Sequence, residues 1–200
     1  MGSVPSTISG FYTALDRQRR EIRVFRISSD STESAPLQCT LRTVSLLDPP
    51  AYEAISYVWG DPSITETLTV DRVDLKVPAN LSGALRLFRK RDLSQGPWLW
   101  ADAVCIDQSN ISERAQQVSL MRDVFTQAHN VRCWLGSEPS DTAAIAKVAR
   151  AMVILKWYHA LDYDIFTSQW GSYRHSDYLN SADAEAVEFL MTRAFWRRTW

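Results

Sequence analysis

The stretch LWADAVCIDQSN, residues 99–110, places two carboxylates and an amide around the end of an apolar run. Asp102 lies inside the run, whereas Asp107 and Gln108 follow it at a polar corner. Carboxylates and amides can accept hydrogen bonds from ribose hydroxyls, and an amide can also donate one to a ligand. These residue types therefore favour binding of a polar small molecule at the end of this run.

A second polar and aromatic group follows the apolar run at residues 54–58. An indole offers a flat face on which a base or ring can stack, and a glycine lets the backbone approach a ligand closely. Together with Asp107 and Gln108, the candidate substrate-binding residues are Tyr57, Trp59, Gly60 and Asp61.

Each group also has a purely structural interpretation. Asp61 precedes Pro62, which is a common turn sequence, and Asp107 can begin the next helix. Asp102 is a sharper case, because an unpaired carboxylate inside an apolar strand costs free energy. Arg114, one turn into the next helix, is a suitable partner, so we expect Asp102 and Arg114 to be structural.

The pattern of apolar residues predicts the elements that must hold these side chains. Alternation and short apolar runs predict strands over residues 21–27, 37–46, 54–58, 66–70, 73–77, 97–104 and 131–135. The fourth and fifth strands form a hairpin around Asp71-Arg72. Helical spacing predicts helices that start at Asn80, Asn110 and Asp141, and a last one over residues 182–194.

The predicted helices carry expectations about caps and buried faces. Asn80 and Asn110 are expected to be N-caps, the latter paired with Glu113 as in a capping box. The three expected apolar faces are Leu81, Ala84, Leu85 and Phe88; Val118, Met121, Phe125 and Ala128; and Ile145, Val148, Met152 and Leu155.

From residue 54 onward, strands and helices alternate, which is typical of an α/β fold with parallel strands joined by right-handed crossovers. Ligands of such sheets bind outside the carboxyl ends of the strands. A third strand end carries Trp134, Gly136 and Ser137. If the three ends are neighbours, their side chains line one crevice.

Composition narrows the class of protein. The net charge of −1 argues against nucleic acid as the main partner. Cysteines at 39, 105 and 133 form no close pair and no zinc spacing, which indicates a reducing, cytoplasmic location without a bound metal. We find no signal peptide, membrane span, GxGxxG, P-loop or GxSxG pattern. Cys105 is expected to be a core cysteine rather than a nucleophile.

Three blocks of the sequence closely resemble the signature of the fungal HET, or heterokaryon incompatibility, domain. They are YEAISYVWGD at 52–61, LWADAVCIDQSNISERAQQVSLMRDVFTQAHNVRCWLG at 99–136 and FWRRTW at 195–200. The resemblance implies a domain over residues 21–200 that triggers programmed cell death when incompatible fungal cells fuse. It also implies a larger parent protein, of which this chain is a C-terminally truncated part. Residues 1–20 are polar and mixed, and we expect them to form a flexible arm.

The HET family is thought to be distantly related to TIR domains, which implies a flavodoxin-like sheet with an added N-terminal strand pair and a hairpin insertion. Many TIR domains cleave NAD with a glutamate four positions after a tryptophan. That glutamate would lie just beyond Trp200, so the resemblance implies NAD as a substrate of the longer protein, no resident cofactor, and an inactive fragment. The alternative is a non-enzymatic module that kills by clustering. Either way, self-association and a sensor or allelic partner protein are expected.

Overall fold

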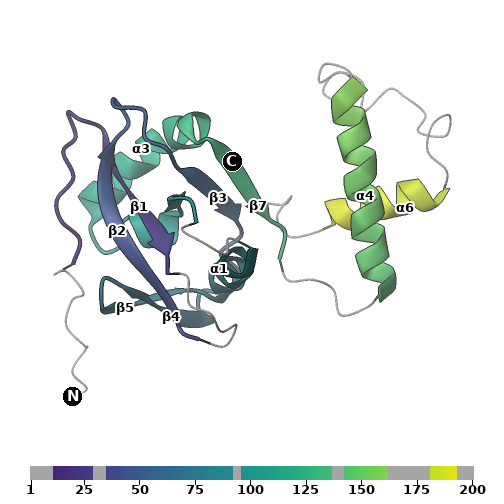
Figure 1. The fold of residues 1–200 in the computed structure, drawn as a ribbon, viewed down its shortest axis with the longest axis horizontal. Coiled ribbons are helices and arrows are strands. Elements are labelled where there is room, and N and C mark those ends of the chain that lie inside the picture. The colour runs from purple at the N-terminus through teal and green to yellow at the C-terminus, as the bar shows by residue number, and fades with distance from the viewer. Residues whose placement is uncertain (1–10, 29–34, 92–95, 137–141, 162–180, 193–200) are drawn as a thin grey trace. The chain divides into compact units, whose positions relative to one another are not determined.

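A computed structural model of the 200-residue chain describes residues 11–28, 35–91, 96–136, 142–161 and 181–192. The chain divides into two compact units, Met1–Trp134 and Leu135–Trp200. The first unit contains the sheet and the second contains two described helices (Figure 1).

The first unit is built on a 7-stranded sheet in the order β5-β4-β2-β1-β6-β3-β7. The strands are β1 (Glu21–Ile27), β2 (Leu37–Ser45), β3 (Glu53–Tyr57), β4 (Thr65–Val70), β5 (Val73–Pro78), β6 (Leu99–Trp100) and β7 (Asn130–Trp134). Strand β3 runs parallel to both β6 and β7. The predicted α/β class and the three neighbouring parallel strands are therefore confirmed.

The N-terminal strand pair and the hairpin belong to the same sheet. Strands β1 and β2 pair antiparallel, β1 joins β6, and β2 pairs parallel with β4. The hairpin β4–β5 turns at Asp71 and Arg72, whose φ angles of 47° and 71° give a tight turn suited to the twist of the two strands. The added strands thus make the sheet mixed.

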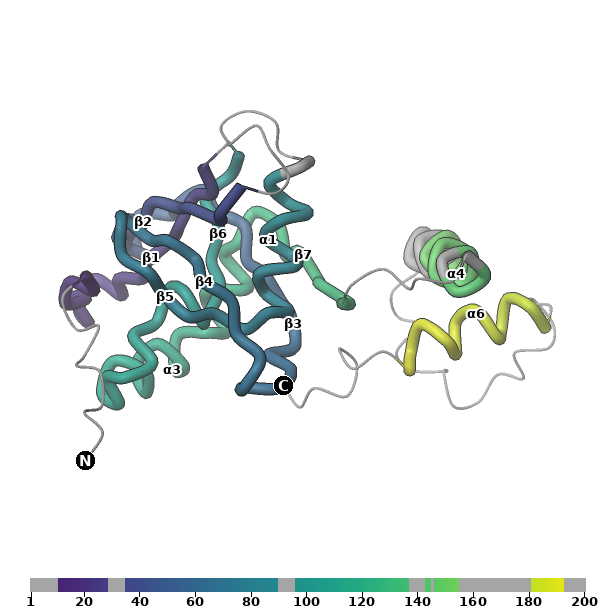
Figure 2. Tube along the Cα trace, turned by 90° about the horizontal axis from the view of Figure 1, so that it is seen from below, coloured from purple at the N-terminus to yellow at the C-terminus, as the bar shows by residue number. Residues whose placement is uncertain are grey.

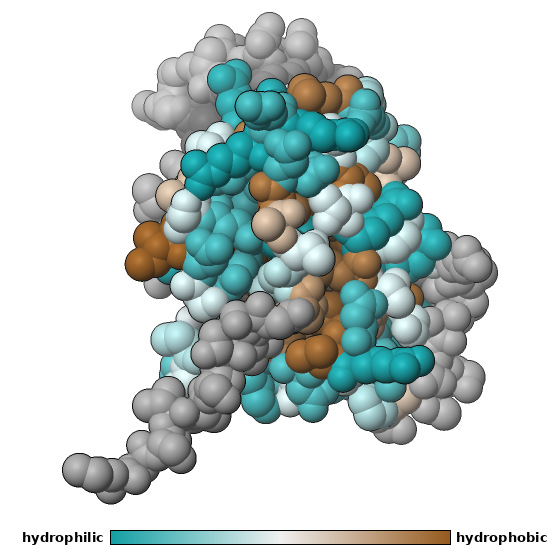
Figure 3. Space-filling view, turned by 90° about the vertical axis from the view of Figure 1, so that its left-hand side faces the viewer, coloured by the Kyte–Doolittle hydropathy of each residue, from teal (hydrophilic) through white to brown (hydrophobic). Residues whose placement is uncertain are grey.

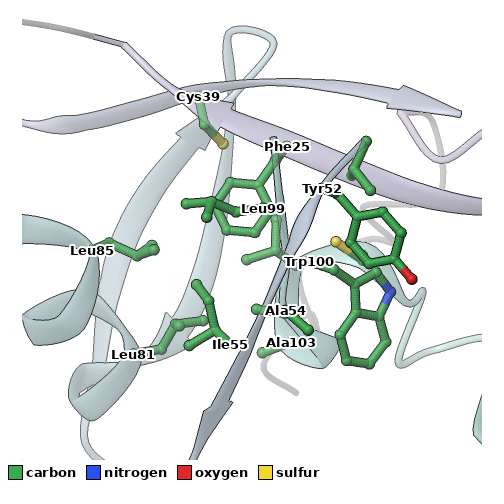
Figure 4. Packing of buried hydrophobic residues seen from close by; sticks show 14 of the residues in the cluster. Phe25, Cys39, Tyr52, Ala54, Ile55, Leu81, Leu85, Leu99, Trp100 and Ala103 are labelled. Carbon is green, nitrogen blue, oxygen red and sulfur yellow. The ribbon is translucent and has the colours of Figure 1, made fainter. Parts of the chain in front are cut away.

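Two helices cover opposite faces of the parallel strands. Helix α1 (Ala79–Arg91) buries Leu81, Ala84, Leu85 and Phe88, as the spacing predicted. Figure 4 shows Leu81 and Leu85 beside Ile55 and Leu99 on one side of β3, with Tyr52 and Trp100 on the other. On that second side lies helix α3 (Ile111–Gln127), where the Trp100 and Phe125 rings meet edge to face at 5.6 Å. Figure 2 shows the same elements from below.

The predicted strand 97–104 is wrong beyond Trp100. Only Leu99–Trp100 is a strand, and Asp102–Cys105 forms the short helix α2. The Ala101 carbonyl accepts hydrogen bonds from the backbone N–H groups of Val104 and Cys105, at 3.0 and 2.8 Å. An Asp at the start of a helix is favourable because its carboxylate can bind free N–H groups there. The local preference of Asp102 therefore overrides the apolar pattern.

The buried face of α3 also differs from the prediction. Asn110 does cap the helix by accepting from the Glu113 N–H at 3.1 Å. However, the predicted inward Val118 is 54% exposed. Met121, Phe125 and Ala128 are partly buried and pack against the core, as predicted. The buried residues of the helix, which were not predicted, are Glu113, Gln117, Leu120 and Val124.

Residues 11–20 do not form the free arm that the sequence suggested. Phe11 packs against the core of the sheet, and the Tyr12 hydroxyl donates to the Val104 carbonyl at 2.9 Å. Arg17 donates to the Ser112 hydroxyl at 2.5 Å. These contacts hold the segment against α2 and α3. Residues 1–10 lie outside the described residues.

Buried and exposed residues alternate along the first part of strand β2. In strand β2, Leu37 and Cys39 are buried, whereas Gln38 and Thr40, which alternate with them, are exposed. Figure 3 shows hydrophilic groups over most of the face on the left of Figure 1, with hydrophobic patches between them. This alternation is typical of a strand with one face on the core.

The second unit contains the helices α4 (Thr142–Leu161) and α6 (Ser181–Met191), close to the predicted ranges. Their core is Ala151, Ala186, Val187 and Leu190. Met152, predicted to face inward, is 51% exposed, and the small Ala151 takes its place. Ion pairs Lys147–Glu185 and Arg150–Asp183 connect the two helices.

Candidate functional site at the carboxyl ends of the parallel strands

The Asp102 carboxylate is the centre of a hydrogen-bond network at the ends of β3 and β6. Its Oδ1 atom accepts from the Tyr57 hydroxyl at 2.8 Å and from the Ala103 N–H at 2.9 Å. Its Oδ2 atom accepts from the Trp59 indole N–H at 2.9 Å. Strand β3 ends at Tyr57 and β6 ends just before Asp102, so the parallel pairing brings these residues together.

The two aromatic donors differ in exposure. Tyr57 is 1% exposed, so its hydrogen bond to Asp102 is made by a buried side chain. Trp59 is 39% exposed, so its ring faces solvent on one side while its N–H is held. A held but accessible indole can bind a flat ring by stacking, with little loss of side-chain freedom.

Asn80 extends this network to β7. Its side-chain amide donates to the Val58 carbonyl at 2.6 Å, and its Oδ1 accepts from the Trp134 indole N–H at 2.7 Å. It lies within the first turn of α1, so the sequence was wrong to expect it just outside the helix as the N-cap. Asn80 was missed as a site residue because nothing local in the sequence indicates a partner 54 positions away.

Gly60 and Asp61 lie in the turn that follows Trp59. Gly60 has φ +75° and an added Cβ would meet nothing within 4 Å, so the backbone there is open to solvent. Asp61 accepts from the N–H and hydroxyl of Ser63 at 2.8 and 2.7 Å, and these hydrogen bonds lower the pKa of its carboxyl group. Its described contacts are those of a turn residue.

Asp107 and Gln108 have different roles: Asp107 makes a local turn, and Gln108 contacts Asp102. The Asp107 carboxylate accepts from the N–H and hydroxyl of Ser109 at 3.0 and 2.6 Å, which forms a local turn before α3. The Gln108 amide instead donates to the Asp102 carbonyl at 2.9 Å, so Gln108 joins the network. Gly136, after β7, has φ 102°, and Ser137 lies outside the described residues.

The expected Asp102–Arg114 pair does not form. Arg114 is exposed and makes no ion pair with any described residue, while both oxygens of Asp102 bind other donors. The preceding residue of α3 is the one that forms an ion pair: Glu113 accepts from Arg23 in β1 at 2.6 and 3.0 Å. This ion pair is buried, with Arg23 at 1% and Glu113 at 8% exposure.

The Arg23–Glu113 pair has further partners. Arg23 donates to the carbonyls of Cys105 and Thr13 and lies 4.7 Å from the centre of the Tyr12 ring. Glu113 also accepts from the Asp107 N–H at 2.8 Å. We call this group the Arg23 clasp, because it ties β1 and the N-terminal segment to the loop that carries the site.

Cys105 lies beside the clasp and is fully buried. Burial raises the pKa of its thiol, so the group stays neutral and is a poor nucleophile. The described residues contain no group of three or more His, Cys, Asp or Glu side chains that could hold a metal ion. One small cavity, lined by residues that include Phe88, Arg89 and Leu99, lies at the other end of the strands.

Residues 52–200 match the family model described as Heterokaryon incompatibility protein (HET). Among curated proteins, the chain is similar to "Heterokaryon incompatibility protein 6, OR allele" of Neurospora crassa, with 34% identity over 141 residues. That match covers 64% of this chain and 21% of the relative, so the chain spans about a fifth of the relative's length. A comparison with solved structures gave no match.

Proposed function

Because the chain belongs to the heterokaryon incompatibility (HET) family, we propose that it is the cell-death effector domain of a fungal allorecognition protein. Its similarity to an allele-named incompatibility protein supports this role. The relative is much longer than the matched region, which fits an effector domain joined to other parts. No helix in the described ranges combines the length and apolarity that crossing a bilayer requires. We propose that the protein acts in the cytoplasm with an allelic or sensor protein as its partner.

We further propose that the assembled, longer protein kills by cleaving NAD, as a TIR-like enzyme. The observation that carries this proposal is the Asp102 carboxylate, which holds the half-exposed Trp59 at the carboxyl ends of parallel strands. This is the edge at which open α/β sheets bind nucleotides. The Tyr57–Asp102–Trp59 network gives a rigid platform for one of the rings of NAD.

In this proposal the described residues bind and orient NAD, and a carboxylate elsewhere in the protein stabilises the positive charge that develops on the ribose. Trp59 stacks on a ring of NAD, and Asp102 is a positioning residue that fixes the indole. The bond between C1′ of the ribose and nicotinamide breaks, and nicotinamide leaves with the electron pair. Water then adds to C1′ and releases one proton to the solvent. A carboxylate stabilises the oxocarbenium-like ribose. By the TIR resemblance, this is a glutamate expected four positions after Trp200.

The test uses the longer protein, including the residues that follow Trp200, and measures nicotinamide release from NAD. Trp59→Ala and Asp102→Asn should each lower kcat/KM by roughly tenfold or more, since misplacement of a bound ring weakens catalysis strongly. Asp61→Asn is the matched control, because its carboxylate is exposed and bound within its own turn. Unchanged nicotinamide release in both site variants would remove the proposed site.

A second candidate function is a non-enzymatic module that kills by clustering. Strand β7 favours it, because among the described residues it pairs with β3 alone and leaves its other edge open. Val131 on this strand is 43% exposed. An open apolar strand edge can pair with another copy. Two results together would favour clustering over catalysis. The protein would kill cells without releasing nicotinamide, and Val131→Lys would abolish both self-association and killing.

A further inference from the structure

Helix α3 has an unusual distribution of polar and apolar residues in its first half. A helix on the surface of a protein normally turns its apolar residues inward and its polar residues outward. Here Glu113 and Gln117 are buried, at 8% and 1% exposure, whereas Ile111 and Val118 are 73% and 54% exposed. The arrangement is therefore the reverse of the normal one.

The inward polar residues have a structural explanation. Glu113 forms the buried ion pair with Arg23, and the Gln117 side chain donates to the Glu21 carbonyl at 2.9 Å. Both side chains therefore fasten α3 to β1. These contacts fix the rotation of the helix, and that rotation turns Ile111 and Val118 outward.

The outward apolar residues have no such explanation within the described part of the chain. Ile111, Ala115 and Val118 are all exposed, and they share one stripe because they lie four and then three positions apart. Isolated exposed apolar residues are ordinary, but a continuous stripe along one helix marks an interaction surface.

The charges beside this stripe are positive. Arg114 and Arg122 are exposed on the same side of α3 and have no hydrogen-bond or ion-pair partner among the described side chains. The acids of the helix are already bound, since Glu113 pairs with Arg23 and Asp123 with Arg20. The surface therefore offers apolar contacts flanked by unneutralised guanidinium groups.

We propose that this surface, the α3 outer stripe (Ile111, Arg114, Ala115, Val118 and Arg122), docks an acidic amphipathic segment of a partner protein. Apolar side chains of the segment pack on Ile111 and Val118, and its carboxylates pair with Arg114 and Arg122. A second copy of this chain fits less well, because two stripes face to face would bring four guanidinium groups together without an acid. The proposal does not depend on NAD cleavage.

The experiment uses the full-length protein and a fluorescein-labelled synthetic helical peptide. The peptide carries leucines at helical spacing flanked by glutamates, and a matched peptide has lysine at each glutamate position. Fluorescence anisotropy should show the acidic peptide binding about tenfold or more tightly than the basic one, with affinity falling as salt rises. Equal affinity for the two peptides would overturn the proposal.

Variants locate the binding surface. Val118→Asp should weaken binding of the acidic peptide about tenfold, and the Arg114→Glu/Arg122→Glu double variant should prefer the basic peptide. Leu47→Asp is the matched control, because Leu47 is 58% exposed but lies outside α3. Circular dichroism melts establish that each variant is folded. Unchanged peptide binding by folded Val118→Asp would refute the proposal. So would self-association of the wild-type protein, measured by sedimentation velocity, if Val118→Asp abolished it.

Discussion

Asp102 and Glu113 are two carboxylates on neighbouring segments, but their surroundings differ in kind. Glu113 is buried and binds a guanidinium group in two hydrogen bonds. Asp102 is partly buried and binds the neutral donors Tyr57 and Trp59. A buried charge needs an opposite charge, whereas a carboxylate near solvent is satisfied by neutral donors.

The comparison indicates which carboxylate belongs to the scaffold. The Arg23 clasp connects β1 to α3 and leaves no accessible face for a ligand. The Asp102 network ends in an indole that is 39% exposed. The clasp therefore supports the loop, and the Asp102 network is the part that a ligand can reach.

The largest expected difference between the two regions is in stability. Glu113→Ala leaves the Arg23 charge buried without its partner, which should lower the free energy of unfolding by about 3–5 kcal/mol. Asp48→Ala is the control, because it removes an ion pair with Arg19 in which the side chains are 69% and 60% exposed, and should cost less than about 1 kcal/mol. Urea unfolding measures both. Similar losses for the two variants would mean that the clasp is not a special support.

A smaller effect is expected at Asp102. Asp102→Ala removes an acceptor shared by the Tyr57 hydroxyl and the Trp59 indole N–H, so the free energy of unfolding should fall by about 1–3 kcal/mol. Acrylamide quenching of tryptophan fluorescence should show that the Trp59 indole is more accessible in Asp102→Ala than in wild type. The same two proteins carrying Trp59→Phe give the signal of the other tryptophans, which is subtracted. Asp61→Ala should leave quenching unchanged, because Asp61 contacts only its own turn in the described structure. If Asp102→Ala quenches like wild type, Asp102 does not hold Trp59.

The strands could be predicted because their signals are local. Apolar runs and alternation place β1, β2, β3 and β7 within a residue or so of their observed bounds. The hairpin followed from two apolar runs around Asp71-Arg72, and the parallel neighbours followed from alternation with helices. These features depend on nearby residues and on general rules of chain connection.

The site could be predicted only in part, because its contacts are distant in sequence. Strand-end reasoning found Tyr57, Trp59 and Gln108, which the structure gathers around Asp102, but it could not separate them from the turn residues Asp61 and Asp107. Arg23 and Glu113 lie 90 positions apart, so neither residue signals the other. That unseen pair sets the rotation of α3, which is why Val118 was placed on the wrong face.

Alkaline pH should sharpen the comparison, because buried neutral acids lie in and beside the clasp. Burial raises the pKa values of Tyr12 and Cys105, and it raises that of Cys39 in the same core to about 12. An acid whose pKa is raised by folding contributes stability below its unfolded pKa, about 9.0 for a thiol, and this stability is lost as pH rises toward the folded value.

The fall in unfolding free energy between pH 7 and pH 10 should therefore be smaller by about 1.4 kcal/mol in Cys105→Ala than in wild type, because the variant lacks the thiolate that stabilises the unfolded chain. The comparison is between slopes, so the constant cost of the lost side chain cancels. Cys133→Ala is the control, since that thiol is exposed on β7 and its removal should change the slope less. An unchanged slope in Cys105→Ala would show that the thiol next to the clasp ionises as readily in the folded chain as in the unfolded one. The clasp region would then be open to water, and the contrast with the Asp102 network would fail.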